Sequence, residues 1–110
     1  MAYDEDLADR IRELVQDEPN LKEQRMFGGL AFLVGGHMSV AASGQGGLML
    51  RCDPEATDDL LGQPGAAPME MRGKEMRGWL RVDAEAVESD EALQTWVERG
   101  VSYARSLPPK

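Results

Sequence analysis

The sequence is poor in cysteine, histidine and aromatic residues, and these scarcities exclude several kinds of protein. Its one cysteine, Cys52, cannot form an internal disulfide, which small secreted domains often need. Its one histidine, His37, cannot build a histidine-based metal cluster, and Cys52 adds only one thiolate. We therefore expect no metal or other cofactor, and the cysteine content favours a cytoplasmic protein.

Long hydrophobic runs are also missing. No segment approaches the ~20 apolar residues that a transmembrane helix needs. The first residues, Met-Ala-Tyr-Asp-Glu-Asp, are acidic, whereas a secretory signal begins basic and then turns apolar. The sequence thus predicts a cytoplasmic location without membrane association. Its 110 residues suffice for one core, so we expect a single domain over residues 1–110.

Positive charge is scarce, because 20 acidic residues outnumber 12 lysines and arginines and leave a net charge of −8. The acidic excess lies in residues 1–20 and 83–98, and the second segment contains no lysine or arginine. Proteins bind nucleic acids largely by neutralising phosphates with these two residue types. The balance therefore disfavours direct nucleic-acid binding, and its simplest role is solubility.

The most informative segment runs from Arg25 to Cys52, where short apolar runs alternate with glycine pairs. Gly35-Gly36 suits a two-residue hairpin turn, because glycine accepts the positive φ that such turns need. Short apolar runs separated by these glycines predict a meander of four strands. The expected strands cover residues 22–27, 30–34, 37–42 and 48–52.

Helical patterns flank this meander. Apolar residues at helical spacing predict a first helix over residues 4–17. A long last helix is predicted to begin at Asp83 or Ser89, and Pro108-Pro109 ends it.

The segment between the meander and the last helix contains further elements. Pro54 opens a short helix that runs to Leu61, and residues 62–68 have the composition of a loop. Residues 69–72 and 77–82 alternate as a hairpin around Gly73-Lys74. The complete order predicts an α+β fold, in which N- and C-terminal helices pack on a mostly antiparallel sheet built from the meander and this hairpin.

No arrangement of residues points to catalysis. Cys52 and His37 could meet across neighbouring strands as nucleophile and base. However, Cys52 alternates with two leucines, which predicts a buried apolar role, and His37 follows a tight turn, which predicts an exposed side chain. The glycine pairs match no phosphate-loop spacing, and the acidic pairs Asp58-Asp59 and Asp90-Glu91 fall on exposed helix positions. We expect a protein that is not an enzyme.

The hairpin is the candidate partner surface, because it interleaves cationic residues with methionine and tryptophan. Arg, Met and Trp are favoured at protein interfaces, and methionine adapts its shape. The alternative is a hairpin whose outer face is simply charged. The candidate residues are Arg72, Lys74, Met76, Arg77, Trp79 and Arg81.

Gly100 lies on the apolar stripe of the last helix. In a helix interior, glycine lowers the stability of the helix by ~1 kcal/mol relative to alanine. Close approach of the helix to the sheet, or to a second subunit, would explain it. Contact between helix and sheet is the commoner cause.

Several motifs, taken in order, resemble the N-terminal domain of the TfoX/Sxy family. The resemblance covers nearly the whole chain. An acidic helix precedes Met26-Phe27-Gly28-Gly29, which opens the meander. The later segments Met69-Glu70-Met71, Gly78-Trp79-Leu80-Arg81-Val82 and Ala104-Arg105-Ser106-Leu107-Pro108 also fit.

This resemblance implies a regulatory protein without catalytic residues. Regulators of this family control competence genes together with a cyclic-AMP receptor protein, and they carry a second, helical C-terminal domain. We expect this chain to be the N-terminal domain standing alone. It would act through contacts with a protein partner, which could belong to the transcription machinery. A homodimer could use an exposed strand edge or the long helix. The alternative is a ligand-binding domain or enzyme with a cleft between sheet and helices.

Overall fold

Both long helices form, and each begins at a residue whose side chain caps it. The computed structural model describes residues 4–26, 28–44, 46–71 and 73–108. Helix α1 (Glu5–Val15) follows Asp4, whose carboxylate accepts a hydrogen bond from the Leu7 backbone amide over 3.2 Å. Helix α3 (Asp90–Ser106) follows Ser89, whose hydroxyl accepts one from the Ala92 amide over 3.1 Å. Such caps satisfy backbone donors that the helix leaves free, and they fix where each helix starts.

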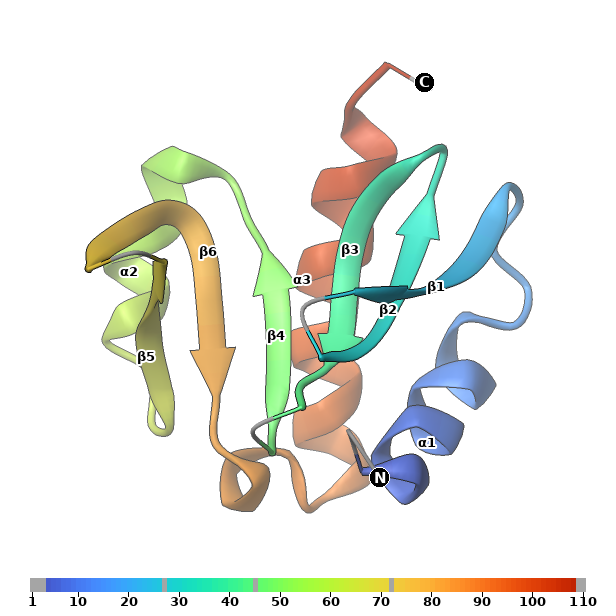
Figure 1. Cartoon of the computed structure of the whole chain (residues 1–110), viewed down its shortest axis with the longest axis horizontal. Helices are drawn as coiled ribbons and strands as arrows, with labels where there is room; N and C mark the ends of the chain where they lie inside the picture. The colour runs from blue at the N-terminus through green and yellow to red at the C-terminus, as the bar shows by residue number, and fades with distance from the viewer. Residues whose placement is uncertain (1–3, 27, 45, 72, 109–110) are drawn as a thin grey trace.

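The strands form one antiparallel sheet in the order β1-β2-β3-β4-β6-β5, which confirms the predicted α+β fold (Figure 1). The meander supplies the first four strands. The hairpin joins it through β6, which pairs with β4 and leaves β5 at the edge. The strands are β1 (Leu21–Met26), β2 (Gly29–Val34), β3 (His37–Ala42), β4 (Leu48–Arg51), β5 (Ala66–Met71) and β6 (Lys74–Val82).

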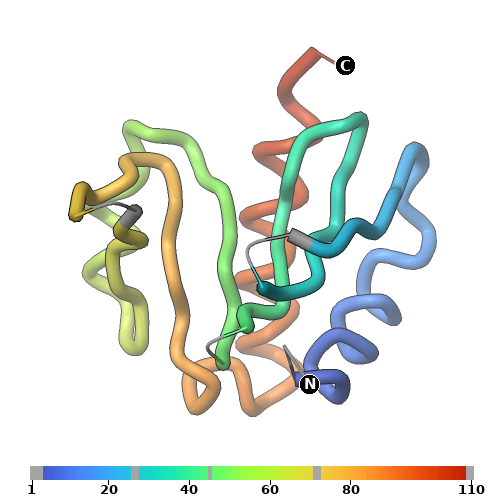
Figure 2. The backbone as a smooth tube through the Cα atoms, viewed as in Figure 1, coloured from blue at the N-terminus to red at the C-terminus, as the bar shows by residue number. Residues whose placement is uncertain are grey.

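Helices α1 and α3 pack on the same face of the sheet, and α3 runs behind β3 and β4 (Figure 2). The main core lies between the helices and this face, with the fully buried Phe32 among its largest side chains. Trp96 and Val97 of α3 join it, as do Leu7 and Ile11 of α1. Within the described part of the chain, no helix is long and apolar enough to cross a bilayer.

Three short segments differ from the expected boundaries. Residues 66–68, predicted as loop, belong to β5, where Ala66 lies opposite Val82. Pro68 fits there because an edge strand tolerates a residue without a backbone N–H. The segment from Pro54 divides into a 3₁₀ turn, η1 (Pro54–Ala56), and helix α2 (Thr57–Leu61). A second 3₁₀ turn, η2 (Ala84–Val87), precedes α3, so Asp83 does not start the long helix.

Gly100 lets α3 approach the sheet at an irregularity in β3. The register shifts between Phe32 and Leu33, and the buried Ser39 hydroxyl donates a hydrogen bond to the Phe32 carbonyl over 2.8 Å. A Cβ at Gly100 would lie 2.4 Å from the Ser39 carbonyl oxygen and 2.7 Å from a Val40 methyl. Contact between helix and sheet therefore explains this glycine.

Candidate functional site

The sheet has a second face, which we call the helix-free face. Its side chains form a small cluster to which the described helices contribute no residue. The methionines of this cluster are nevertheless buried. The cluster contains Ala31, Met38, Ala41, Met49 and Met69, and the partly buried Leu33 and Trp79 pack against it.

Arg51 links the helix-free face to α3 at one end of the sheet. Its guanidinium carbon lies 5.6 Å from the centre of the Trp79 ring, which is opposite it across β4 and β6. It lies equally far, 5.6 Å, from the ring centre of Tyr103 on α3. At this range a cation is attracted to an aromatic face. Arg51 therefore helps to orient Trp79, which is half-buried.

The predicted partner residues do not form one continuous surface, because they divide between the two faces of the sheet. Trp79 and Arg81 lie on the helix-free face, where Arg81 is opposite Met49. Arg77 lies on the other side and donates a hydrogen bond from Nε to the Pro54 carbonyl over 2.8 Å. Met76 lines a hollow beside α2. Lys74 is exposed, and Arg72 lies outside the described residues.

The division occurs at Gly78, a position that alternation alone does not reveal. Gly78 has a φ of +88°, and its carbonyl accepts a hydrogen bond from the Cys52 amide over 2.8 Å. Its own amide donates to the Thr57 hydroxyl over 2.9 Å. The left-handed backbone breaks the simple alternation along β6, because only glycine adopts it readily. Arg77 and Trp79 therefore point to different surroundings.

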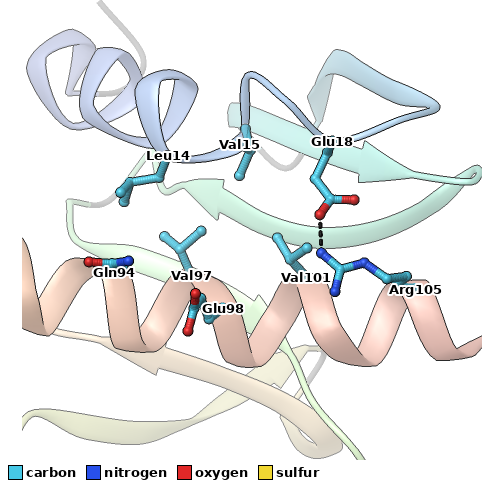
Figure 3. Close-up of a pocket in the computed structure, with 8 residues that line it drawn as sticks. All are labelled: Leu14, Val15, Glu18, Gln94, Val97, Glu98, Val101 and Arg105. Carbon is cyan, nitrogen blue, oxygen red and sulfur yellow. Dashed lines mark hydrogen bonds and ion pairs between the residues drawn. The ribbon is translucent and has the colours of Figure 1, made fainter.

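A separate cavity of about 90 Å³ lies between α1 and α3 (Figure 3). Glu18 and Arg105 form an ion pair across one end of it. Leu14, with 40% of its surface exposed, lies on the α1 side. The other lining residues are Val15, Gln94, Val97, Glu98 and Val101. This cavity lies between two helices, not between sheet and helices, and it is much smaller than the ~300–1,000 Å³ of ordinary ligand pockets.

A broader hollow of about 470 Å³ lies at the end of β6, where Arg81 and Asp83 are its charged residues. It borders the connection between β3 and β4 at Gly46 and Gly47. Like the cavity between the helices, it differs from the expected cleft between sheet and helices.

The order of strands, the helix positions and the hairpin can be compared with a known family. The chain matches the profile of the TfoX N-terminal domain over residues 13–104. It belongs to that family. Comparison with curated proteins gave no match. The matched range of this TfoX N-terminal domain includes the whole helix-free face.

Cys52 and His37 have different partners in this TfoX N-terminal domain. Cys52 is buried, as predicted, and its sulfur lies 3.8 Å from the Thr57 hydroxyl. His37 is half-buried, which corrects the exposed position expected for it. The reason is the chain that follows α3, where the Pro108 carbonyl lies 2.6 Å from His37 Nε2.

Burial raises the pKa of the Cys52 thiol, and the hydrogen bond with Thr57 only partly opposes this effect. The thiolate is the reactive form, so a raised pKa and a closed surface both slow reaction. We expect a thiol-specific disulfide reagent at pH 8 to label the folded domain at least about tenfold more slowly than the urea-unfolded chain. Equal labelling rates, measured under conditions in which circular dichroism shows the domain folded, would contradict this burial.

Proposed function

We propose that this TfoX N-terminal domain is a non-enzymatic regulatory module that acts through protein–protein contacts. The observation that carries the proposal is the composition of the helix-free face. The half-buried Trp79 lies there beside Arg51 and packs against a cluster rich in methionine. Trp and Arg are enriched among residues that dominate binding energy, and methionine adapts to different partners.

The regulatory part of the proposal comes from the family. TfoX/Sxy regulators act on competence genes, so a component of the transcription machinery is the proposed class of partner, in a cytoplasmic setting. For a homodimer, β1 is the better exposed edge, because Pro68 removes a backbone donor from β5. Charged residues along β1 oppose such pairing, however, so a different protein is the preferred partner.

Two single variants test the interaction function. We expect Trp79→Ala to lose partners that the wild-type domain retains in affinity purification from its native cells, because truncation removes an interface anchor. Arg77→Ala is the matched control, since Arg77 is two residues away on the same strand but faces η1. Thermal melts establish that both variants are folded. The proposal fails if every partner of the wild-type domain is retained by folded Trp79→Ala.

Small-ligand binding is the second candidate function, and it is favoured by the broad hollow beside Arg81. Among the residues that the structure describes, Arg81 and Asp83 are the charged groups that line this hollow. Ligand sites in proteins usually combine concavity with several convergent polar groups. The helix-free face therefore supports an interaction module better than the hollow supports a ligand-binding protein.

A further inference from the structure

The charged residues of the strands are unevenly distributed between the two faces of the sheet. Four basic residues occupy the helix-free face. Lys22 lies opposite Leu33, and Arg81 lies opposite Met49. Met49 belongs to the cluster on the helix-free face, and Leu33 packs against it. Arg51 contacts Trp79 on the same face. Lys74 lies opposite Met71, which is two residues along β5 from the cluster residue Met69, so strand alternation places Lys74 on the helix-free side.

The acidic residues of the strands all lie on the side of the helices. Glu23 forms an ion pair with Arg12 of α1 over 2.8 Å. Glu75 lines the hollow beside α2, and Glu70 lies opposite Glu75 across the hairpin. Within the strands that the structure describes, the helix-free face thus carries positive charge only, in a chain whose net charge is −8.

The two sides of the molecule therefore differ in charge. The acidic first turns of α1 and α3 lie on the side of the main core, where both helices pack. The basic side chains surround methionine, alanine and tryptophan on the other side. Complementary charge steers a partner into one orientation, and like charge repels the wrong one. The helix-free face therefore suits a partner of negative charge.

We infer that the helix-free face docks an acidic segment of a partner protein, in which carboxylates alternate with apolar side chains. The inference rests on the proposed interaction function and adds the chemistry of the partner. Carboxylates of the segment bind the guanidinium of Arg51 and the ammonium groups of Lys22 and Lys74, since Arg geometry matches carboxylate pairs. Its apolar side chains contact the half-buried side chains of Trp79 and Leu33.

A protein segment fits this face better than a nucleic acid does. A nucleic acid is a long polyanion whose affinity depends on many phosphate contacts. It would extend past the four basic residues and meet the field of the acidic helices. A short acidic segment can lie wholly on the helix-free face. The acidic helices repel it little there, because charges farther apart than about 8 Å are largely screened at physiological salt.

Two double variants with equal changes in charge separate the faces. Lys22→Glu with Lys74→Glu reverses charge on the helix-free face. Arg25→Glu with Arg77→Glu makes the same change on the same two strands, β1 and β6, but on the side of the helices, where Arg25 lies opposite Leu30 of the main core. All four side chains are exposed, so both variants are expected to fold.

The probe is a short fluorescein-labelled peptide in which Glu alternates with Val and Leu, followed by fluorescence anisotropy. We expect the wild-type domain to bind it more weakly as salt rises. The Lys22/Lys74 variant should lose at least about tenfold in affinity, whereas the Arg25/Arg77 variant should stay within about twofold. A peptide with Gln in place of Glu, and a single-stranded oligonucleotide of similar length, should bind at least about tenfold more weakly.

Equal losses in the two double variants would overturn the inference, as would equal binding of the Gln peptide or the oligonucleotide. Sedimentation that shows a dimer broken only by the Lys22/Lys74 changes would assign the face to a second copy instead. Affinity purification separates this inference from the interaction function. Native partners lost by the Arg25/Arg77 variant and kept by the Lys22/Lys74 variant would leave the interaction function standing and refute the basic face. No native partner for the wild-type domain would refute both.

Discussion

Replacing Phe32 with alanine is expected to lower the free energy of unfolding by about 3–5 kcal/mol. Phe32 is fully buried in β2, and it packs in the cluster that joins the sheet to α1 and α3. Its truncation removes apolar contacts and leaves a cavity that the two helices and the sheet cannot fully close. Urea denaturation followed by circular dichroism measures the loss.

Leu33→Ala is the matched control for this prediction. Leu33 is the next residue of β2, but it is half-buried and faces the helix-free side. We expect Leu33→Ala to lower the free energy of unfolding by about 1 kcal/mol, since the Leu33 side chain removes less apolar surface from water when the domain folds. Comparable losses at the two positions would show that the main core does not lie on the helix side of the sheet.

Gly100→Ala is expected to destabilise the domain by about 1–3 kcal/mol, although alanine is the better helix former. The added Cβ would lie 2.4 Å from the Ser39 carbonyl oxygen, so α3 must move away from β3. At a helical glycine without such a contact, the same change would instead stabilise the domain by about 1 kcal/mol. Thermal unfolding distinguishes the two, because the sign of the shift in melting temperature differs.

Ser102→Ala is the control for Gly100→Ala, because Ser102 is an exposed residue of the same helix. This change should raise stability by a few tenths of a kcal/mol, as expected from helix propensity alone. If Gly100→Ala also raised the melting temperature, the close approach of α3 to the sheet would be wrong.

The sequence predicted those parts of the fold that depend on local signals. Glycine pairs located the meander, and Ser89, a capping residue type that precedes two acidic residues, was one of the two expected starts of the last helix. The strand status of Ala66 could not be predicted, because Pro68 argues against a strand. The pairing of β6 with β4, which places β5 at the edge where proline is tolerated, is a long-range feature.

The candidate site was harder to predict, because it depends on which face each side chain occupies. Residue types drew attention to the hairpin as a place where Arg, Met and Trp gather. Alternation alone did not reveal that Gly78 has a left-handed backbone, which separates Arg77 from Trp79. Nor could it reveal that Lys22 of β1 lies on the same face as Arg81 of β6, since β2, β3 and β4 lie between these two strands in the sheet.

Site-specific photo-cross-linking tests most directly the claim that the helix-free face carries the partner. Gln24 and Arg25 are adjacent exposed residues of β1. Gln24 pairs with Ala31 and points to the helix-free face, whereas Arg25 pairs with Leu30 and points to the side of the helices. A photoreactive phenylalanine at position 24 should cross-link a native partner protein, and the same residue at position 25 should not. Cross-linking at position 25 alone would contradict the account and assign the partner to the side of the helices.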